Sequence, residues 1–239
     1  MKRALVTGGS GAIGGAICSA LARCGMHVIV HGHGNPVRAA QLAEAIRADG
    51  GSAESVTFDV SRAAPAASAL EKILEGGAVQ VLVHNAGITA DAPMAGMSDA
   101  QWSSVIGVSL DGFFNVARPL LLPMLRTRWG RIVAITSVAG IMGNRGQSNY
   151  AAAKAGLHGA VKSLAIEVAS RGVLVNAVAP GIIASDMSRK AFAEDAIERL
   201  VPMGRAGTPE EVASVVAFLC SDEAAYVSGQ VLGVNGAMA

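Results

Sequence analysis

The first 23 residues combine a short apolar strand, a glycine-rich turn and a helical segment in immediate succession. The strand A-L-V at 4–6 precedes the turn T-G-G-S-G-A-I-G at 7–14, and a helical pattern runs over Ile13–Arg23. Glycines permit a tight turn and let a pyrophosphate approach the backbone, where the helix N-terminus favours its charge. From Gly9 the turn fits GxGxxG in the strand–turn–helix context that this pattern requires. The unit predicts a dinucleotide site; the alternative is a glycine-rich turn without a ligand.

The same alternation of apolar strands and helical segments continues along the chain. Strands are expected near 3–7, 27–31, 54–58, 79–84, 131–137, 173–178 and 231–235. Helices are expected near 12–24, 36–48, 66–75, 99–127, 149–170 and 209–220. This order is typical of an α/β fold of the Rossmann type, a doubly wound parallel seven-stranded sheet with helices on both faces.

No linker, repeat or low-complexity tract divides the chain, so we expect a single domain over 1–239. Its 51% hydrophobic content suits one large core. Residues 182–205 have the least regular pattern, with a short helix expected within 188–200. This segment is a candidate for a lid over the substrate.

Charge and composition argue against several classes of function. The net charge is +1 and no long run of one sign occurs, so no nucleic acid or membrane-surface partner is expected. No apolar stretch is expected to reach the length of a secretion signal with its cleavage site or of a membrane span, and we therefore expect a cytoplasmic protein. The three cysteines, Cys18, Cys24 and Cys220, lack metal-ligand spacing and are expected to be buried, reduced thiols. No metal site is predicted.

The segment Y-A-A-A-K places Tyr150 and Lys154 four residues apart. Ser137 lies 13 residues before Tyr150, at the end of the apolar run R-I-V-A-I-T-S. On a helix this spacing puts both side chains on one face. A neighbouring cation is expected to lower the pKa of the phenol, which suits proton transfer near neutral pH. With Ser137 holding a carbonyl oxygen, the group indicates carbonyl/alcohol redox chemistry. The alternative is a buried tyrosine beside a solvated lysine.

The end of the second strand, H-V-I-V-H-G-H-G-N-P, bears on the choice of cofactor. An NAD-specific site carries an acidic residue there, but none occurs between Met26 and Gln41. Its absence removes repulsion against a 2′-phosphate, and His33, Asn35 and Arg38 are candidate donors. NADP(H) is therefore favoured over NAD(H); the alternative is that His31 and His33 are exposed loop residues without a role in cofactor binding.

Taken together, these motifs resemble the short-chain dehydrogenase/reductase family over essentially the whole chain. The matching features are T-G-G-S-G-A-I-G, Asp59-Val60, Asn85-Ala86-Gly87, Ser137, Tyr150/Lys154, Asn176 and Pro180-Gly181. Within the family, M-G-N-R-G-Q-S-N-Y-A-A-A-K-A-G-L and A-P-G-I-I-A-S-D-M are similar to segments of beta-ketoacyl-acyl-carrier-protein reductases.

The resemblance implies which residues bind the cofactor. They would be Gly8, Ser10, Ile13 and Gly14 at the pyrophosphate, Asp59 and Val60 at adenine, Asn85, Ala86 and Gly87 beneath adenine and ribose, Tyr150 and Lys154 at the nicotinamide ribose, and Pro180, Gly181, Ile183 and Ser185 at the nicotinamide. Each segment also has a plainer interpretation as a turn or a cap.

Two positions depart from the family pattern. Ser109 stands where the family usually has an asparagine that helps to hold a water relaying protons to the lysine. Serine is shorter and donates one proton, so the relay is expected to differ. Gly11 stands where NADP-dependent relatives often carry arginine, which weakens the preference for NADP(H).

The resemblance implies reduction of a small-molecule thioester, a 3-oxoacyl group on acyl carrier protein, with Ser137 and Tyr150 bonding the ketone oxygen. Arg128 and Arg171 would meet the acidic carrier. Arg126, Arg128 and Arg131 are expected to cluster in R-T-R-W-G-R, and a solvated helix end is the alternative for this cluster. A homotetramer is expected, because the helices near 99–127 and 149–170 carry small and apolar residues on more than one face. Alternatives are a reductase of a CoA ester or polyketide, a sugar or steroid dehydrogenase, and a weakly catalytic assembly subunit.

Overall fold

The computed structural model describes residues 1–185 and 194–239. Its seven strands form one parallel sheet in the order β3-β2-β1-β4-β5-β6-β7. The strands are β1 (Arg3–Thr7), β2 (His27–His31), β3 (Ser52–Val56), β4 (Val81–His84), β5 (Gly130–Ile135), β6 (Val173–Pro180) and β7 (Val231–Val234). The order reverses at β1, where Leu5 lies opposite Ile29 of β2 on one side and Leu82 of β4 on the other. The predicted doubly wound sheet is confirmed.

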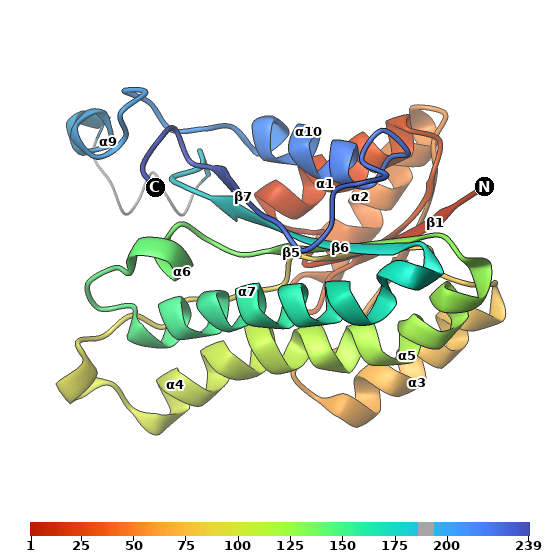
Figure 1. The fold of residues 1–239 in the computed structure, drawn as a ribbon, viewed down its shortest axis with the longest axis horizontal. Coiled ribbons are helices and arrows are strands. Elements are labelled where there is room, and N and C mark those ends of the chain that lie inside the picture. Colours follow the sequence, from red (N-terminus) through yellow and green to blue (C-terminus); the bar gives the residue numbers. More distant parts are fainter. Residues whose placement is uncertain (186–193) are drawn as a thin grey trace.

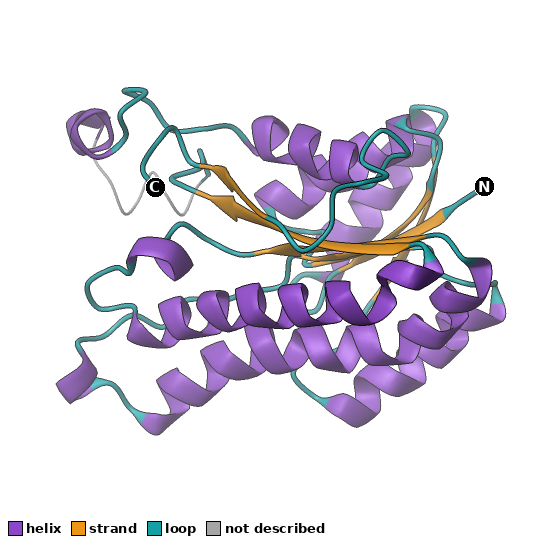
Figure 2. Ribbon diagram, viewed as in Figure 1, coloured by secondary structure: helices purple, strands orange, loops and turns teal. Residues whose placement is uncertain are grey.

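Helices cover both faces of the sheet (Figures 1 and 2). One layer contains α1 (Ala12–Arg23), α2 (Pro36–Ala48) and α10 (Pro209–Leu219). The other contains α3 (Ala63–Glu75), α4 (Asp99–Ile106), α5 (Gly112–Thr127) and α7 (Ser148–Val168). Two short helices, α6 (Ala139–Met142) and α9 (Glu194–Leu200), lie toward the carboxyl ends of the strands. The short helix expected within 188–200 is thus present as α9, while residues 186–193 of the expected lid lie outside the described residues.

The core consists of one apolar cluster on each face of the sheet. On one face Ile17 and Leu21 of α1 pack with Val216 of α10. On the other face Leu120 of α5 and Leu157 of α7 pack against the strands. The central strands are buried on both sides, and for that reason their sequences are nearly continuous runs of aliphatic residues.

Several helix ends follow the local sequence signals. Gly25, Gly50 and Gly172 adopt positive φ just beyond helix C-termini, a conformation that costs glycine little. Thr208 caps α10 by accepting from the backbone N–H of Glu211, whose carboxylate accepts in return from the Thr208 N–H. These signals confirm the predicted boundaries of α1, α2 and α10.

One predicted strand is displaced. β3 covers Ser52–Val56, not 54–58, because its only neighbour in the sheet ends at His31, which pairs with Val56. Beyond that point the chain has no strand to bond. Phe58 and Val60 are nevertheless buried, at 5% and 3% exposed, in the segment that leads to α3.

The helix predicted over 99–127 contains a defect, a π-helical turn at Gly107–Asp111 between α4 and α5. Among the described residues, Asp99–Thr127 is the one helical stretch long and apolar enough to cross a membrane by length and composition. The expectation that no stretch reaches this length was therefore wrong. In the fold this stretch packs beside α3 and α7, and its apolar side covers the sheet.

The cysteines are free, as expected, but they differ in burial. Cys18 and Cys220 are buried, whereas Cys24 is exposed just after α1, so the prediction of three buried thiols was wrong. Burial raises the pKa of the Cys220 thiol to about 12. The two buried cysteines act as small apolar residues between α1 and α10.

Candidate active site

The carboxyl ends of β1, β4, β5 and β6 bring four sequence motifs to one edge of the sheet. Thr7, His84, Ile135 and Pro180 are the last residues of these strands. The edge includes the point where the strand order reverses at β1, and open α/β sheets bind ligands at such a point. The motifs that are far apart in the sequence are therefore close together in the fold.

The glycine-rich turn packs directly against the segment after β4. Gly8 has φ +65°, and a Cβ placed on it would lie 2.9 Å from Asn85 Nδ2. A Cβ on Gly14 would overlap the Gly8 carbonyl oxygen and lie 2.7 Å from Asn85 Nδ2. Any side chain at these positions would displace the turn from Asn85, so both glycines are required by close approach.

The N-terminus of α1 is open for an anion. Its N-cap residue is Gly11, which has no side chain to bond the first N–H groups of the helix. Ile13 and Gly14 lie in this first turn, and Ser10 precedes the cap. The residues predicted for a pyrophosphate are thus gathered at a helix N-terminus without a side-chain cap, which fits a dinucleotide phosphate group.

His31 supports the glycine-rich turn from below and is 2% exposed. Its Nε2 donates to the Phe58 carbonyl at 2.8 Å, so Nδ1 accepts from the Gly8 N–H at 3.1 Å. Burial lowers the pKa of this imidazole and favours the neutral form. The alternative that His31 is an exposed loop residue is therefore wrong.

Asp59 and His33 lie side by side at the expected adenine end. Asp59 Oδ1 accepts from the Ser61 N–H at 2.9 Å and from the Ser61 hydroxyl at 2.7 Å, which lowers the pKa of the carboxyl. Its Oδ2 lies 3.9 Å from His33 Nε2. His33, with a side chain 59% exposed, is open to a ligand.

Ser137 and Tyr150 meet across the space between β5 and α7. The Ser137 side chain lies close enough to the Tyr150 hydroxyl to lower the pKa of the phenol. Ser137 Oγ also accepts from the Ala139 N–H at 3.1 Å, which fixes the oxygen and leaves its hydrogen free to donate. The two hydroxyls can therefore converge on one acceptor, as a carbonyl oxygen requires.

Lys154 lies one turn beyond Tyr150, as the spacing predicted, and is 3% exposed. Nζ donates to the Ile135 carbonyl at 2.9 Å, which anchors the side chain to the end of β5. Burial lowers the pKa of Lys154 to about 8. The alternative of a solvated lysine is excluded by this burial.

The prediction that a neighbouring cation lowers the pKa of Tyr150 was wrong. Burial raises the pKa of the phenol, and the nearby Ser137 side chain opposes the rise. Lys154 Nζ lies 5.5 Å from the centroid of the Tyr150 ring and contacts the ring as a cation–π pair. The loss of water around the buried hydroxyl therefore outweighs the influence that lowers its pKa.

Asn149 orients the start of α7, and sequence reasoning missed it. It is fully buried, and its Nδ2 donates to the carbonyls of Ala90 and Gln101 at 3.0 and 3.1 Å. Its Oδ1 accepts from the Tyr150 N–H at 2.8 Å. Only the residue's place beside Tyr150 in the sequence hints at this role, because an asparagine at a helix start is ordinary.

Pro180, Gly181 and Ile183 complete the edge beyond β6. A Cβ on Gly181 would lie 2.8 Å from Asn235 Cα, so the chain there passes close to the C-terminal segment. Ile183 forms a bridge with Gly207. Ser185, also predicted for the nicotinamide end, is the last residue before the segment that the structure leaves undescribed.

The two arginines predicted for the carrier lie away from this edge. Arg128 and Arg171 precede β5 and β6, at the amino ends of the strands, and the Gly130 N–H bonds the Gly172 carbonyl between them. Figure 1 shows α7 running from the active-site edge, where it begins, to this opposite edge, where it ends. With 21 residues the helix separates Tyr150 from Arg171 by about 30 Å.

Arg131, the third arginine of the R-T-R-W-G-R segment, has a structural role. It is 3% exposed, stacks 4.2 Å from the centroid of the Trp129 ring, and donates to the Ser221 carbonyl. The expected cluster of three arginines is therefore wrong, because strand β5 directs the third side chain inward.

Comparisons with known proteins agree with this geometry. A family described as "Enoyl-(Acyl carrier protein) reductase" matches residues 8–238. The chain belongs to the short-chain dehydrogenase/reductase family, and membership implies a nicotinamide cofactor. It is similar to the "3-oxoacyl-[acyl-carrier-protein] reductase FabG" of Aggregatibacter actinomycetemcomitans, with 46% identity over 236 residues and 98% of both chains. The proteins of that name from Escherichia coli and Pseudomonas aeruginosa are 48% and 44% identical, each over 99% of this chain and 97% of the relative.

Proposed function

We propose that the chain reduces a 3-oxoacyl thioester, carried on acyl carrier protein, to the 3-hydroxyacyl thioester with NADPH. The observation that carries the proposal is the meeting of Ser137, Tyr150 and buried Lys154 at the carboxyl end of β5, on the edge of the sheet that also holds the glycine-rich turn. Similarity to reductases named for 3-oxoacyl carrier substrates supports the substrate class. We propose that the chain acts as one domain over 1–239.

Each member of the group has a separate task. Ser137 donates a hydrogen bond to the ketone oxygen and holds it against Tyr150. Tyr150 transfers its hydroxyl proton to that oxygen as negative charge develops there, and Lys154 stabilises the phenolate left behind. When bound, the reduced nicotinamide supplies the hydride to the ketone carbon. Burial raises the pKa of Tyr150, which keeps the proton on the phenol and available for transfer.

NADP(H) rather than NAD(H) is proposed from the surroundings of the glycine-rich turn. A hollow of about 450 Å³ beside the turn is lined by residues that include Ser10, Gly11, Arg23 and Arg38. Gly11 contributes no side chain, so an arginine from α2 supplies the cation that a 2′-phosphate needs. His33 is a second donor close by, although Asp59 Oδ2 competes for its Nε2.

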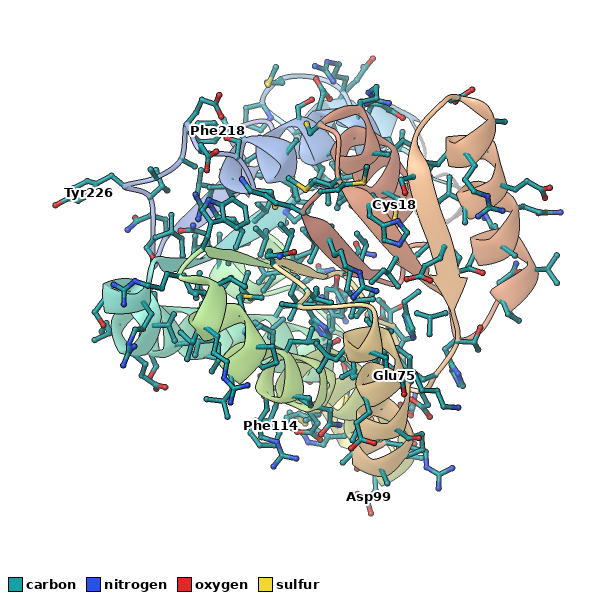
Figure 3. The ribbon with its side chains drawn as sticks, turned by 90° about the vertical axis from the view of Figure 1, so that its right-hand side faces the viewer. Cys18, Glu75, Asp99, Phe114, Phe218 and Tyr226 are labelled. Carbon is teal, nitrogen blue, oxygen red and sulfur yellow. The ribbon has the colours of Figure 1, made fainter. Side chains whose placement is uncertain are left out.

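A homotetramer is proposed from two apolar surfaces on different sides of the chain. Phe114, Leu122 and Ile166 are 56%, 67% and 83% exposed on α5 and α7. Phe218 and Tyr226, 44% and 103% exposed, lie on a separate side (Figure 3). Two self-complementary surfaces are what a tetramer with two kinds of two-fold interface requires. We also propose a cytoplasmic location.

The experiment is a steady-state comparison of substrates and cofactors. Acetoacetyl and trans-2-butenoyl groups, each on carrier protein and on CoA, are assayed with NADPH and with NADH. The proposal expects the highest kcat/KM for carrier-bound acetoacetyl with NADPH. Faster turnover of the butenoyl substrate would instead support enoyl reduction, the activity in the description of the matching family.

Tyr150→Phe tests the proton donor in the same assay. Because the hydroxyl is lost and the ring is kept, kcat should fall by at least ~100-fold while NADPH affinity changes little. Retention of more than a tenth of the wild-type kcat, a barrier change below about 1.4 kcal/mol, would remove Tyr150 from this role.

A further inference from the structure

Ser109 carries a buried hydroxyl without a partner. It is fully buried, and among the buried side-chain nitrogen and oxygen atoms of the described residues its Oγ is the one that makes no hydrogen bond. Leaving such a group unpaired destabilises a protein, so its presence calls for a functional reason. The hydroxyl belongs to the site that the proposed function uses, and the following inference rests on that function.

The unpaired hydroxyl and the Lys154 ammonium lie near the same glycine. A Cβ placed on Gly87 would lie 3.1 Å from Lys154 Nζ and 3.5 Å from Ser109 Oγ. The ammonium nitrogen and the hydroxyl oxygen therefore lie beside the same point above Gly87, where a side chain would crowd the ammonium. The Ser109 hydroxyl and the buried Lys154 ammonium are thus both neighbours of Gly87.

The backbone of Ser109 is held from outside its own helix. Ser109 lies in the π-helical turn Gly107–Asp111, and such turns are frequent at functional sites. Its carbonyl accepts from His84 Nε2 at 2.9 Å. The imidazole, at the end of β4, therefore ties the defect in the helix to the centre of the sheet.

The hydrogens of the His84 network can be assigned one by one. A carbonyl only accepts, so Nε2 carries the ring hydrogen and Nδ1 accepts from the Thr7 hydroxyl at 3.2 Å. Thr7 Oγ1 in turn accepts from the N–H groups of Asn85 and Ala86, both at 3.0 Å. Complete burial lowers the pKa of His84 to about 3, which keeps the ring neutral at working pH.

We propose that His84 is a positioning residue for catalysis, which holds the π-helical turn so that the Ser109 hydroxyl faces Lys154 and can return protons to the active site. Each turnover removes one proton from Tyr150. Lys154 replaces it and becomes a neutral amine. Ser109 gives its hydroxyl hydrogen to that amine and takes another from a water molecule that enters the buried site, so the lysine regains its charge and the net proton comes from solvent. His84 orients this path and carries no proton itself.

The test combines two variants and their double mutant. Asparagine at position 84 is too short to reach Thr7 and Ser109 together, so His84→Asn should lower kcat roughly tenfold, the effect of one orienting hydrogen bond. The affinity for NADPH should change by less than about threefold, and the solvent deuterium isotope effect on kcat should increase, because proton return becomes limiting. In a Ser109→Ala background the same change should have no further effect on kcat.

His31→Asn is the matched contrast, because His31 is also buried and bonds through both ring nitrogens, but to Gly8 and Phe58. This variant should weaken NADPH binding without an increase in the isotope effect. Two results would show that His84 has only a structural role. One is an equal solvent isotope effect in His84→Asn and His31→Asn, and the other is an additive loss of kcat in the double mutant with Ser109→Ala.

A measurement on the wild-type protein covers the case in which His84→Asn does not fold. Nitrogen-15 NMR of the imidazole should show hydrogen on Nε2 and none on Nδ1 from about pH 5 to 8. The opposite tautomer would overturn the inference. Absence of wild-type turnover on every 3-oxoacyl substrate would defeat the proposed function instead, so the two failures are distinguishable.

Discussion

Single residues in this site owe their chemistry to burial more than to their neighbours. Lys154 shows this most clearly, because burial alone lowers the pKa of its ammonium from 10.5 to about 8. The charged form is therefore lost as pH rises through about 8 in the folded protein but near 10.5 in the unfolded chain. Between these values the unfolded chain binds more protons, so this group makes folding more favourable with rising pH in that window. Below about pH 8 the cost of burying the charge is present in full.

Activity should follow the opposite course, because the proposed proton supply needs the ammonium. We expect kcat/KM for NADPH, which reports on the free enzyme, to fall about tenfold per pH unit above about pH 8. Lys154→Arg keeps the charge and should abolish this decline, whatever its overall rate. A wild-type kcat/KM that does not change up to pH 10 would contradict this prediction, because it would show that the Lys154 pKa is not lowered by burial.

At the scale of elements, the contact between the glycine-rich turn and Asn85 makes α1 part of the site. Gly14→Ala should weaken NADPH binding at least ~10-fold and lower the melting temperature, because its Cβ would overlap the Gly8 carbonyl oxygen. Gly15→Ala is the control one residue on, where the nearest atoms would lie at 3.6 Å. Alanine there should stabilise the helix by about 0.5–1 kcal/mol. Thermal denaturation and NADPH titration of both variants test this prediction. If Gly14→Ala is as stable as Gly15→Ala, the glycine-rich turn can move to accommodate the added Cβ.

For the whole molecule, the distance between Arg128 or Arg171 and the active-site edge matters most. Both lie at the amino ends of the strands, so within one chain they do not touch the reacting group. In the proposed homotetramer, pairing along α5 and α7 with the chains antiparallel would bring these arginines toward a partner's active site. Their contribution would then be electrostatic steering of an acidic carrier.

Arg128→Glu with Arg171→Glu should therefore lower kcat/KM for a carrier-bound substrate and spare the CoA ester. The loss should shrink as salt rises, because surface charges are screened over about 8 Å at physiological ionic strength. Arg126→Glu, an exposed arginine at the end of the same helix, is the control for general charge effects. Equal losses for both substrates would mean that the arginines are ordinary solvated residues.

The sequence by itself determined the sheet, most helix ends and the group of Ser137, Tyr150 and Lys154. These features depend on local signals, namely strand–helix periodicity, capping residues and a spacing of four on one helix face. It also suggested the glycine-rich turn, because close approach of two backbones demands glycine at fixed positions.

Only the tertiary structure decided which polar residues are buried and what they contact. His31, His84 and Asn149 are separated by up to 118 positions along the chain, and nothing local distinguishes them from surface residues. Their roles come from partners brought close by parallel strands, such as Thr7 and the Ser109 carbonyl around His84. The direction of the Tyr150 pKa shift likewise depends on how much water the fold excludes. A spacing rule can place a lysine beside a phenol, but it cannot measure burial.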